Sequence, residues 1–178
     1  MKRILAIILS AVLALFCVAC GEQQGETSSA PKEEPKEMNV ISEANGIISQ
    51  YALSGGTLYT PDGEDALDDD LILSYFGDAM SVPDFSLVET YALYIDETKP
   101  ISPCEFGIFK MKDSKDAEML KAFLDARIRM KLQNAALYPD MDTSALTSAK
   151  VTVTGNYVWY CAVKDANAAI DASLKEKA

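Results

Sequence analysis

One hairpin signature constrains the fold of this chain more than any other feature. Residues 150–163 read "KVTVTGNYVWYCAV", two runs of β-favouring residues joined by a Gly-Asn pair. A two-residue connection with glycine first suits a tight antiparallel turn. In the second run Tyr157, Trp159 and Cys161 should share one face of the strand, and the residues between them the other. The segment therefore predicts a β-hairpin with large side chains on both faces.

A second pair of strands and a long helix precede this hairpin. The segments "LVETYALYI" (87–95) and "CEFGIFKM" (104–111) are rich in β-branched and aromatic residues. Beyond Asp113 or Ser114, either of which can cap a helix, apolar residues recur at helical spacing until Pro139. The order predicts two hairpins with one long helix between them.

Three further helices complete the expected pattern. Helical spacing of apolar residues predicts helices over roughly 38–53 and after Asp68, and we expect Asp165 to cap a final helix. The expected order is α-α-β-β-α-β-β-α. It indicates an α+β domain with a four-stranded antiparallel sheet, built of two hairpins, and helices packed on it.

The strand aromatics are candidates for a binding surface. We expect the helices to seal one face of the sheet, whereas an antiparallel sheet tolerates a wet second face. A single buried face cannot absorb all of the large strand side chains. The prediction is that at least one of four rings stays partly exposed opposite the long helix, where a partner docks. These rings are Tyr94, Tyr157, Trp159 and Tyr160.

The beginning of the chain has the composition of an export signal. Lys2 and Arg3 precede an uncharged apolar run from Ile4 to Phe16. This run is shorter than the roughly 20 residues that a membrane-spanning helix needs. It therefore favours a signal peptide over a transmembrane helix.

The end of this run resembles the lipobox of bacterial lipoproteins, in which a cysteine follows the cleavage point. The junction reads Cys17-Val18-Ala19-Cys20, with Cys17 where the usual residue is leucine. The resemblance implies that Cys20 receives a diacylglycerol and becomes the first residue of the mature chain. Anchoring by acyl chains contributes about 0.8 kcal/mol per buried CH₂, so stable attachment needs more than one chain. The alternative is a secreted protein that is cut nearby and keeps Cys20 as a thiol.

A polar segment separates this signal from the domain. Residues 21–37 read "GEQQGETSSAPKEEPKE", which is too polar to fold and has the composition of a tether some 20–25 Å long. The predicted organisation is a signal peptide over 1–19, the lipidated Cys20 with its tether over 20–37, and one domain over 38–178.

Charge and composition exclude several classes of function. The chain has 27 acids, 16 Lys and Arg residues and no histidine. Cleavage removes two of the bases, so the mature chain keeps 14 against 27 acids, a net charge of −13. This argues against nucleic acid and against electrostatic attraction to anionic lipids. Without histidine there is no Ser-His-Asp or Cys-His triad; we predict no catalytic residue, cofactor or metal.

Three acidic features have simpler explanations than a site. In the run that begins at Asp62, an EF-hand loop would need an oxygen ligand, a glycine and a glutamate at positions five, six and twelve, where the chain has Ala66, Leu67 and Leu73. Asp140 and Asp142 suit helix capping as well as paired-carboxylate chemistry. Glu105 lies within a predicted strand; a ligand contact is one interpretation, and an edge-strand charge that blocks aggregation is the favoured one.

Two cysteines remain beyond the predicted lipidation site. Cys104 and Cys161 both lie in predicted strands, and an exported protein meets oxidising conditions. A disulfide requires Cα atoms within about 7 Å. The sequence leaves open a disulfide between them or two buried thiols that act as small apolar residues.

The domain also resembles a known family. The segments "CEFGIFKMKDSKDAEMLKAFLDARIRMKLQ", "YPDMD" and "VTVTGNYVWYCAV" are similar to small Gram-positive bacterial lipoproteins described only as a domain of unknown function. The resemblance covers roughly residues 40–175. It implies a lipid-anchored protein on the outer face of the cytoplasmic membrane and supplies no catalytic residue.

These observations lead to a functional hypothesis with two alternatives. We expect an extracytoplasmic, membrane-anchored module that binds another envelope protein or a small ligand. A cell-surface hydrolase that uses carboxylates alone is the alternative from a different class. A transporter's substrate receptor is less favoured, because the domain is small and shows no two-lobed duplication.

Overall fold

The computed structural model describes residues 37–77, 80–96, 98 and 104–178. Its strands form one antiparallel sheet in the order β1-β2-β3-β5-β4. The strands are β1 (Gly56–Tyr59), β2 (Val88–Asp96), β3 (Glu105–Met111), β4 (Val151–Thr154) and β5 (Tyr157–Ala162). The α+β class and the antiparallel pairing expected from the sequence are confirmed.

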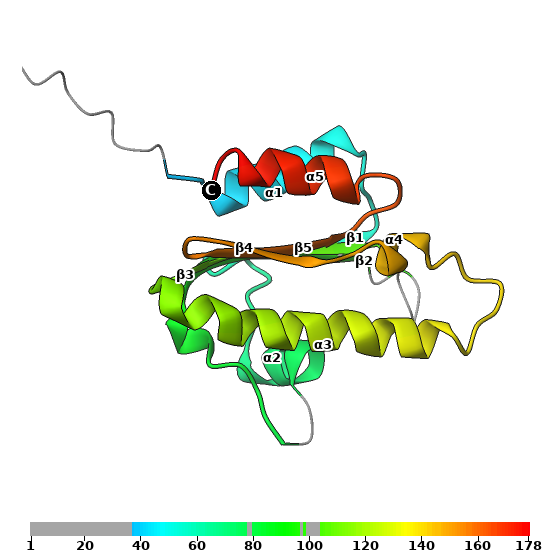
Figure 1. Cartoon of the computed structure of the whole chain (residues 1–178), viewed down its shortest axis with the longest axis horizontal. Coiled ribbons are helices and arrows are strands. Elements are labelled where there is room, and N and C mark those ends of the chain that lie inside the picture. The colour runs from blue at the N-terminus through cyan, green and yellow to red at the C-terminus, as the bar shows by residue number, and fades with distance from the viewer. Residues whose placement is uncertain (1–36, 78–79, 97, 99–103) are drawn as a thin grey trace, which may run out of the picture. The chain divides into compact units, whose positions relative to one another are not determined.

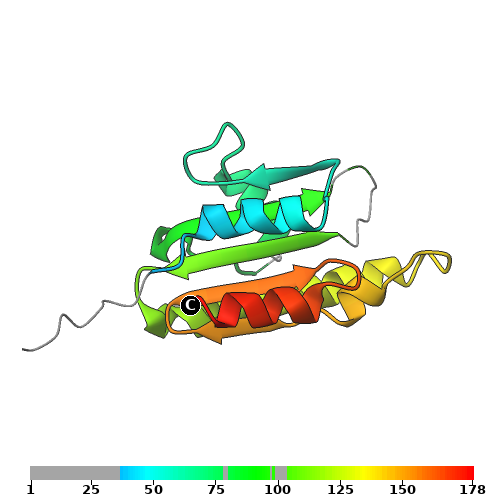
Figure 2. The same cartoon turned by 90° about the horizontal axis from the view of Figure 1, so that it is seen from above.

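Helices cover both faces of this sheet, as Figure 1 shows. One layer contains α1 (Val40–Gln50) and α5 (Asn167–Lys175), and the other contains α2 (Asp69–Phe76) and α3 (Ala117–Ala135). Figure 2 shows α5 lying over the β4–β5 hairpin with α1 beside it. The shorter elements are α4 (Ser144–Thr147) and the 3₁₀ turns η1 (Phe85–Leu87) and η2 (Ser114–Asp116).

The expectation of four strands was wrong, because the sheet has a fifth strand. β1 is only four residues long and pairs with β2, with Leu58 opposite Tyr94. The strand begins at Gly56, the second residue of the Gly55-Gly56 pair that follows α1. A short run that begins with glycine carries little strand signal, so only its pairing with β2 defines it.

The second helix begins after Asp68 as expected, and of the caps expected at Asp113 or Ser114 and at Asp165 only the first is found. Asp68 caps α2, where its carboxylate accepts a 2.8 Å hydrogen bond from the Leu71 N–H. Asp113 caps η2, which leads into the long helix. Asp165 does not cap α5; it adopts a left-handed conformation with φ of +58°, and the helix begins after Ala166.

The alternation predicted for the second hairpin strand is confirmed. Tyr157, Trp159 and Cys161 pack in the core beneath α1 and α5. Val158 and Tyr160 pack in the core between the sheet and α2 and α3. Both faces of the sheet are therefore interior.

This arrangement overturns the prediction of an exposed aromatic face. The exposed fractions are 3% for Tyr94, 6% for Tyr157, 1% for Trp159 and 0% for Tyr160. The prediction was wrong because it allowed the helices only one face of the sheet. The polar atoms of the four rings are bonded inside the domain: Tyr94 accepts from the Gly56 N–H, and the other three donate. The docking hypothesis for this face is withdrawn.

The expected signal peptide, the lipidated Cys20 and nearly all of the tether lie outside the described residues. Within the part of the chain that is described, no helix is both long enough and apolar enough to cross a membrane. The anchor stays a prediction from the sequence.

We predict opposite effects for two glycine substitutions. A Cβ at Gly107 would lie 2.6 Å from a Phe109 ring carbon and 2.9 Å from a Tyr160 ring carbon. Gly107→Ala should lower the free energy of unfolding by about 1–3 kcal/mol, because the core rings cannot yield without strain. Urea unfolding followed by fluorescence of Trp159, the single tryptophan, measures the change.

Gly46 in α1 provides the matched control. A Cβ there would meet nothing within 4 Å. Gly46→Ala should raise the free energy of unfolding by about 0.5–1 kcal/mol, since alanine favours the helix. A Gly107→Ala protein as stable as the unaltered chain would contradict the close packing of β3 against β5.

Candidate functional site

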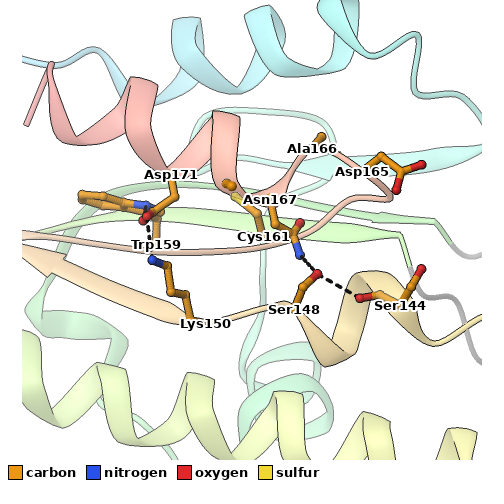
Figure 3. Close-up of a pocket in the computed structure, with 10 residues that line it drawn as sticks. Ser144, Ser148, Lys150, Trp159, Cys161, Asp165, Ala166, Asn167 and Asp171 are labelled. Atoms are coloured by element: carbon orange, nitrogen blue, oxygen red, sulfur yellow. Dashed lines mark hydrogen bonds and ion pairs between the residues drawn. The ribbon is translucent and has the colours of Figure 1, made fainter.

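A pocket of about 580 Å³ opens between the β4–β5 hairpin, α4 and the first turn of α5. Figure 3 shows side chains from these elements converging on it. Its polar lining residues are Ser144, Ser148, Lys150, Asp165, Asn167 and Asp171. The pocket therefore combines one cation, two carboxylates, two hydroxyls and an amide.

Asp171 on α5 fixes the geometry of the pocket. One carboxylate oxygen accepts hydrogen bonds from Thr152 Oγ1 at 2.6 Å and from Trp159 Nε1 at 3.2 Å. The other oxygen contacts the ammonium groups of Lys150 and Lys175, each at 2.9 Å. These contacts join α5 to both strands of the hairpin, because Thr152 belongs to β4 and Trp159 to β5.

The environment of Asp171 keeps its carboxylate ionised. Burial raises its pKa, but hydrogen bonds from Thr152, Lys175 and Lys150 outweigh burial and hold the pKa below its usual range. A general acid in a hydrolase needs the opposite shift, towards neutral pH. Asp171 is therefore suited to hold a cationic group or to position Lys150, and unsuited to donate a proton.

Asn167 organises the other end of the pocket. Its side-chain oxygen accepts from the Val163 N–H at 2.8 Å, at the turn between β5 and α5. Its amide nitrogen donates to the Ala145 carbonyl at 2.8 Å and to Ser148 Oγ at 2.9 Å. Ser148 in turn donates to the Ser144 carbonyl at 2.8 Å, as Figure 3 shows. The single turn of α4 and its C-cap residue Ser148 are thus held against the start of α5.

An apolar wall lines the same pocket. It consists of Trp159, Cys161, Ala166 and Ala168. Burial raises the pKa of the Cys161 thiol far above its usual range, with Asp171 adding to the effect. The thiol stays protonated at neutral pH and is not an activated nucleophile.

A second polar cluster lies inside the domain, around Glu105 on β3. Its carboxylate is fully buried and accepts from Arg127 Nε at 3.0 Å, from an Arg127 terminal nitrogen at 2.7 Å and from the Tyr160 hydroxyl at 3.1 Å. Lys131 also donates to it. Arg127 donates further to the Tyr75 carbonyl at 2.8 Å and lies over the rings of Tyr75 and Phe76.

This geometry corrects the edge-strand interpretation of Glu105. β3 is the central strand of the sheet, so its residues guard no edge. Burial raises the Glu105 pKa, but Arg127 and Lys131 outweigh burial and lower it below the usual range. The ionised cluster joins β3 to α3 and, through Tyr75, to α2, which is a structural role.

The remaining acidic candidates are separate from the pocket or lie at its margin. Among the described residues, no group of three or more Cys, Asp or Glu side chains is arranged to hold a metal ion. Asp142 accepts from the Ser144 N–H at 3.0 Å at the start of α4 and from Lys164 at 2.7 Å. Asp142 lies one residue before the N-cap, Thr143, and satisfies the N–H of the first residue of α4.

The two cysteines both carry reduced thiols in the structure. Phe106 lies opposite Cys161 in the β3–β5 pair, so Cys104, two residues earlier, is diagonal to Cys161 on the same face. Diagonal pairs have Cα atoms about 7–8 Å apart, at the limit for a disulfide. A disulfide between them stays a prediction that thiol labelling of the unreduced, unfolded protein can test.

The sequence placed Trp159 and Cys161 among its candidates but missed the polar side of the pocket. Asp171 carried a signal, because Ile170, Asp171 and Leu174 share the buried stripe of α5. An acid in an apolar stripe predicts a buried partner. Lys150 and Asn167 carried no comparable signal, since both residue types are common at element ends.

We predict that Glu105→Gln lowers the free energy of unfolding by about 3–5 kcal/mol at neutral pH, because it leaves the buried guanidinium of Arg127 without its counterion. Urea denaturation measures the loss. Asp142→Asn, which breaks the exposed contact with Lys164, should change stability far less.

The unaltered protein and the Glu105→Gln variant should also differ in how their stability depends on acid pH. Because folding lowers the Glu105 pKa, its stabilising effect is complete above the usual glutamate pKa of about 4.3. The effect is lost as the pH falls towards the lower pKa of the folded state. Glu105→Gln should therefore flatten the acid limb of stability against pH; equal acid sensitivity in both proteins would contradict an ionised Glu105.

The comparisons with known proteins identify one part of the chain. Residues 84–163 match the model of a family described as a domain of unknown function, DUF4358. No curated protein matches the chain, and no solved structure does. The matched segment runs from η1 through the β4–β5 hairpin and includes Glu105 and Arg127, whereas Asp171 lies beyond it. Residues 84–163 of this chain are therefore similar to the DUF4358 family.

Proposed function

We propose that this protein is a binding module, held by a lipid anchor on the outer face of the cytoplasmic membrane of a Gram-positive bacterium. The pocket between α4, α5 and the β4–β5 hairpin is its ligand site. The location is supported by the basic start, the apolar run and the lipobox-like junction at Cys20. The tether composition of the following residues fits a domain that works a short distance from the lipid.

The ligand class follows from the charges that line the pocket. Lys150 is 62% exposed at its side chain and has capacity for a further anionic partner beside Asp171. Asp165 lines the same pocket and is exposed. A small zwitterion, such as an amino acid or a short peptide, would direct its carboxylate to Lys150 and its ammonium group to Asp165. The apolar wall around Trp159 would contact the remaining part of the ligand.

One observation carries this proposal: a cation and two carboxylates face one pocket beside the single tryptophan. The carboxylate-dependent hydrolase remains the alternative from another class. This alternative has less support, because Asp171 is held ionised and the chain has no histidine that could act as a general acid or base. Release of product from a dipeptide by the purified protein would favour the hydrolase.

We predict that zwitterionic dipeptides change the fluorescence of Trp159 in the unlipidated mature protein. Lys150→Gln and Asp165→Asn should each weaken the response about tenfold, since charge-assisted hydrogen bonds contribute about 1.5–3 kcal/mol. Asparagine tolerates the left-handed backbone at residue 165, so the second substitution preserves the turn. A titration of emission against dipeptide concentration measures both effects.

Lys164→Gln is the matched control, because Lys164 neighbours the turn but contacts Asp142 and does not line the pocket. It should leave the titration unchanged. The ligand site would be contradicted if no amino acid or dipeptide in a panel changed Trp159 emission. Equal responses from Lys150→Gln and the unaltered protein would contradict it too.

The anchor makes a separate prediction. Cys20→Ser removes the thiol that the lipid would modify, so the protein should leave the membrane fraction or keep its signal peptide. Fractionation of cells and the mass of the recovered chain measure the two results. Cys17→Ser is the control, since residue 17 should depart with the signal. A Cys20→Ser protein that is cut before residue 20 and stays in the membrane would contradict the anchor.

A further inference from the structure

A second hollow lies on the α2–α3 side of the domain, between α2 and the loop that leads into η1. It is a groove of about 630 Å³. Leu73 and Val82 line it and are 51% and 49% exposed, and Phe85 lies partly buried beside them. Large apolar side chains that are grouped around a groove and half exposed are typical of an interaction site.

The charge around this groove is of one sign. Asp69, Asp70 and Asp84 line it, and none of the described residues that line it is Lys or Arg. Within the described part of the chain, Asp69 and Asp70 have no ion-pair partner. Lys112 lies at the margin, where it donates to the Ser86 carbonyl at 2.7 Å. The groove therefore presents apolar side chains beside at least two uncompensated carboxylates.

Local structure explains only part of this arrangement. Asp69 and Asp70 lie in the first turn of α2, where the helix dipole favours acids. Asp84 accepts from the Ser86 N–H at 2.9 Å and so stabilises η1. Neither role requires Leu73 or Val82 to be exposed between the acids.

We propose that this groove docks an amphipathic segment of a partner protein that carries apolar side chains next to Lys or Arg. The apolar side chains would cover Leu73 and Val82, and the cations would pair with Asp69 and Asp70. Charge complementarity also decides against other occupants. A second copy of this chain, at a net charge of −13 after cleavage, and an anionic lipid surface would both be repelled. This docking surface is separate from the small-ligand pocket and goes beyond it.

The test uses the full mature chain with Cys20→Ser and two synthetic peptides of about four helical turns. One peptide places leucine on one face and lysine on the other, and its counterpart has glutamate in place of every lysine. Fluorescence anisotropy should show that the lysine peptide binds and that the glutamate peptide binds at least about tenfold more weakly. Added salt should weaken the binding of the lysine peptide.

Substitutions in the groove should remove this binding. Leu73→Ser combined with Val82→Ser should weaken it at least about tenfold. Asp69→Asn combined with Asp70→Asn should weaken it several-fold and reduce its dependence on salt. All four positions are exposed, so the variants should stay folded, which circular dichroism checks.

Matched controls lie on the loop after α3, away from the groove. Leu137 is 76% exposed and Asp140 is exposed; Leu137→Ser and Asp140→Asn should leave binding unchanged. The proposal would be overturned by equal binding of both peptides, by unchanged binding of the lysine peptide to the groove variants, or by an equal loss of binding in the controls. Self-association in sedimentation that Leu73→Ser abolishes would overturn it too, in favour of a second copy. Lys150→Gln should bind the peptide normally, which separates this test from that of the small-ligand pocket.

Discussion

The buried carboxylate of Glu105 is the interaction on which the arrangement of the layers depends. An ionised group on the central strand is stable only if opposite charges reach it inside the domain. Arg127 and Lys131 supply those charges from α3, and Arg127 continues to the Tyr75 carbonyl at the end of α2. A single charge thus sets how α3 lies across the sheet and how α2 packs against α3. On the opposite face of the sheet, hydrogen bonds to Asp171 join α5 to both strands of the last hairpin.

The polar clusters around Glu105 and Asp171 hold helices over both faces of the sheet. They therefore determine which surfaces are accessible to other molecules. Both faces of the sheet are interior, so Tyr94, Tyr157, Trp159 and Tyr160 form no exposed docking face. The two binding sites that we propose lie at the margins of the helical layers. The pocket beside Asp171 combines charges of both signs and suits a small zwitterion. The groove at α2 combines apolar side chains with acids and suits a basic segment of a larger partner. The two surfaces are chemically different, so one module has room for two kinds of binding.

Much of this fold follows from local patterns, and the errors arise where distant segments meet. The alternation of Tyr157, Trp159 and Cys161 and the start of α2 after Asp68 depend on neighbouring residues, and the sequence predicted both correctly. The sequence did not predict strand β1, because only its hydrogen-bonded pairing with β2 makes this short segment a strand. The sequence could not show that α1 and α5 pack on the face opposite α3. For this reason it predicted an exposed aromatic ring on a face that is in fact buried. Glu105 was misinterpreted for the same reason, since its partners lie more than twenty residues away on α3. The polar half of the pocket is likewise a product of tertiary packing.

The most direct test of this account is a titration of the Glu105 side chain itself. Carbon-13 labelling of glutamate and NMR of the carboxyl carbons follow each protonation as the pH is lowered, with Glu105→Gln identifying the signal. We predict that Glu105 stays ionised at neutral pH and titrates below the usual glutamate value of about 4.3, or only when the domain unfolds. A carboxyl carbon that titrates at or above that value in the folded protein would show that the buried charge is not paired as described. The layers would then have to be held together by some other interaction.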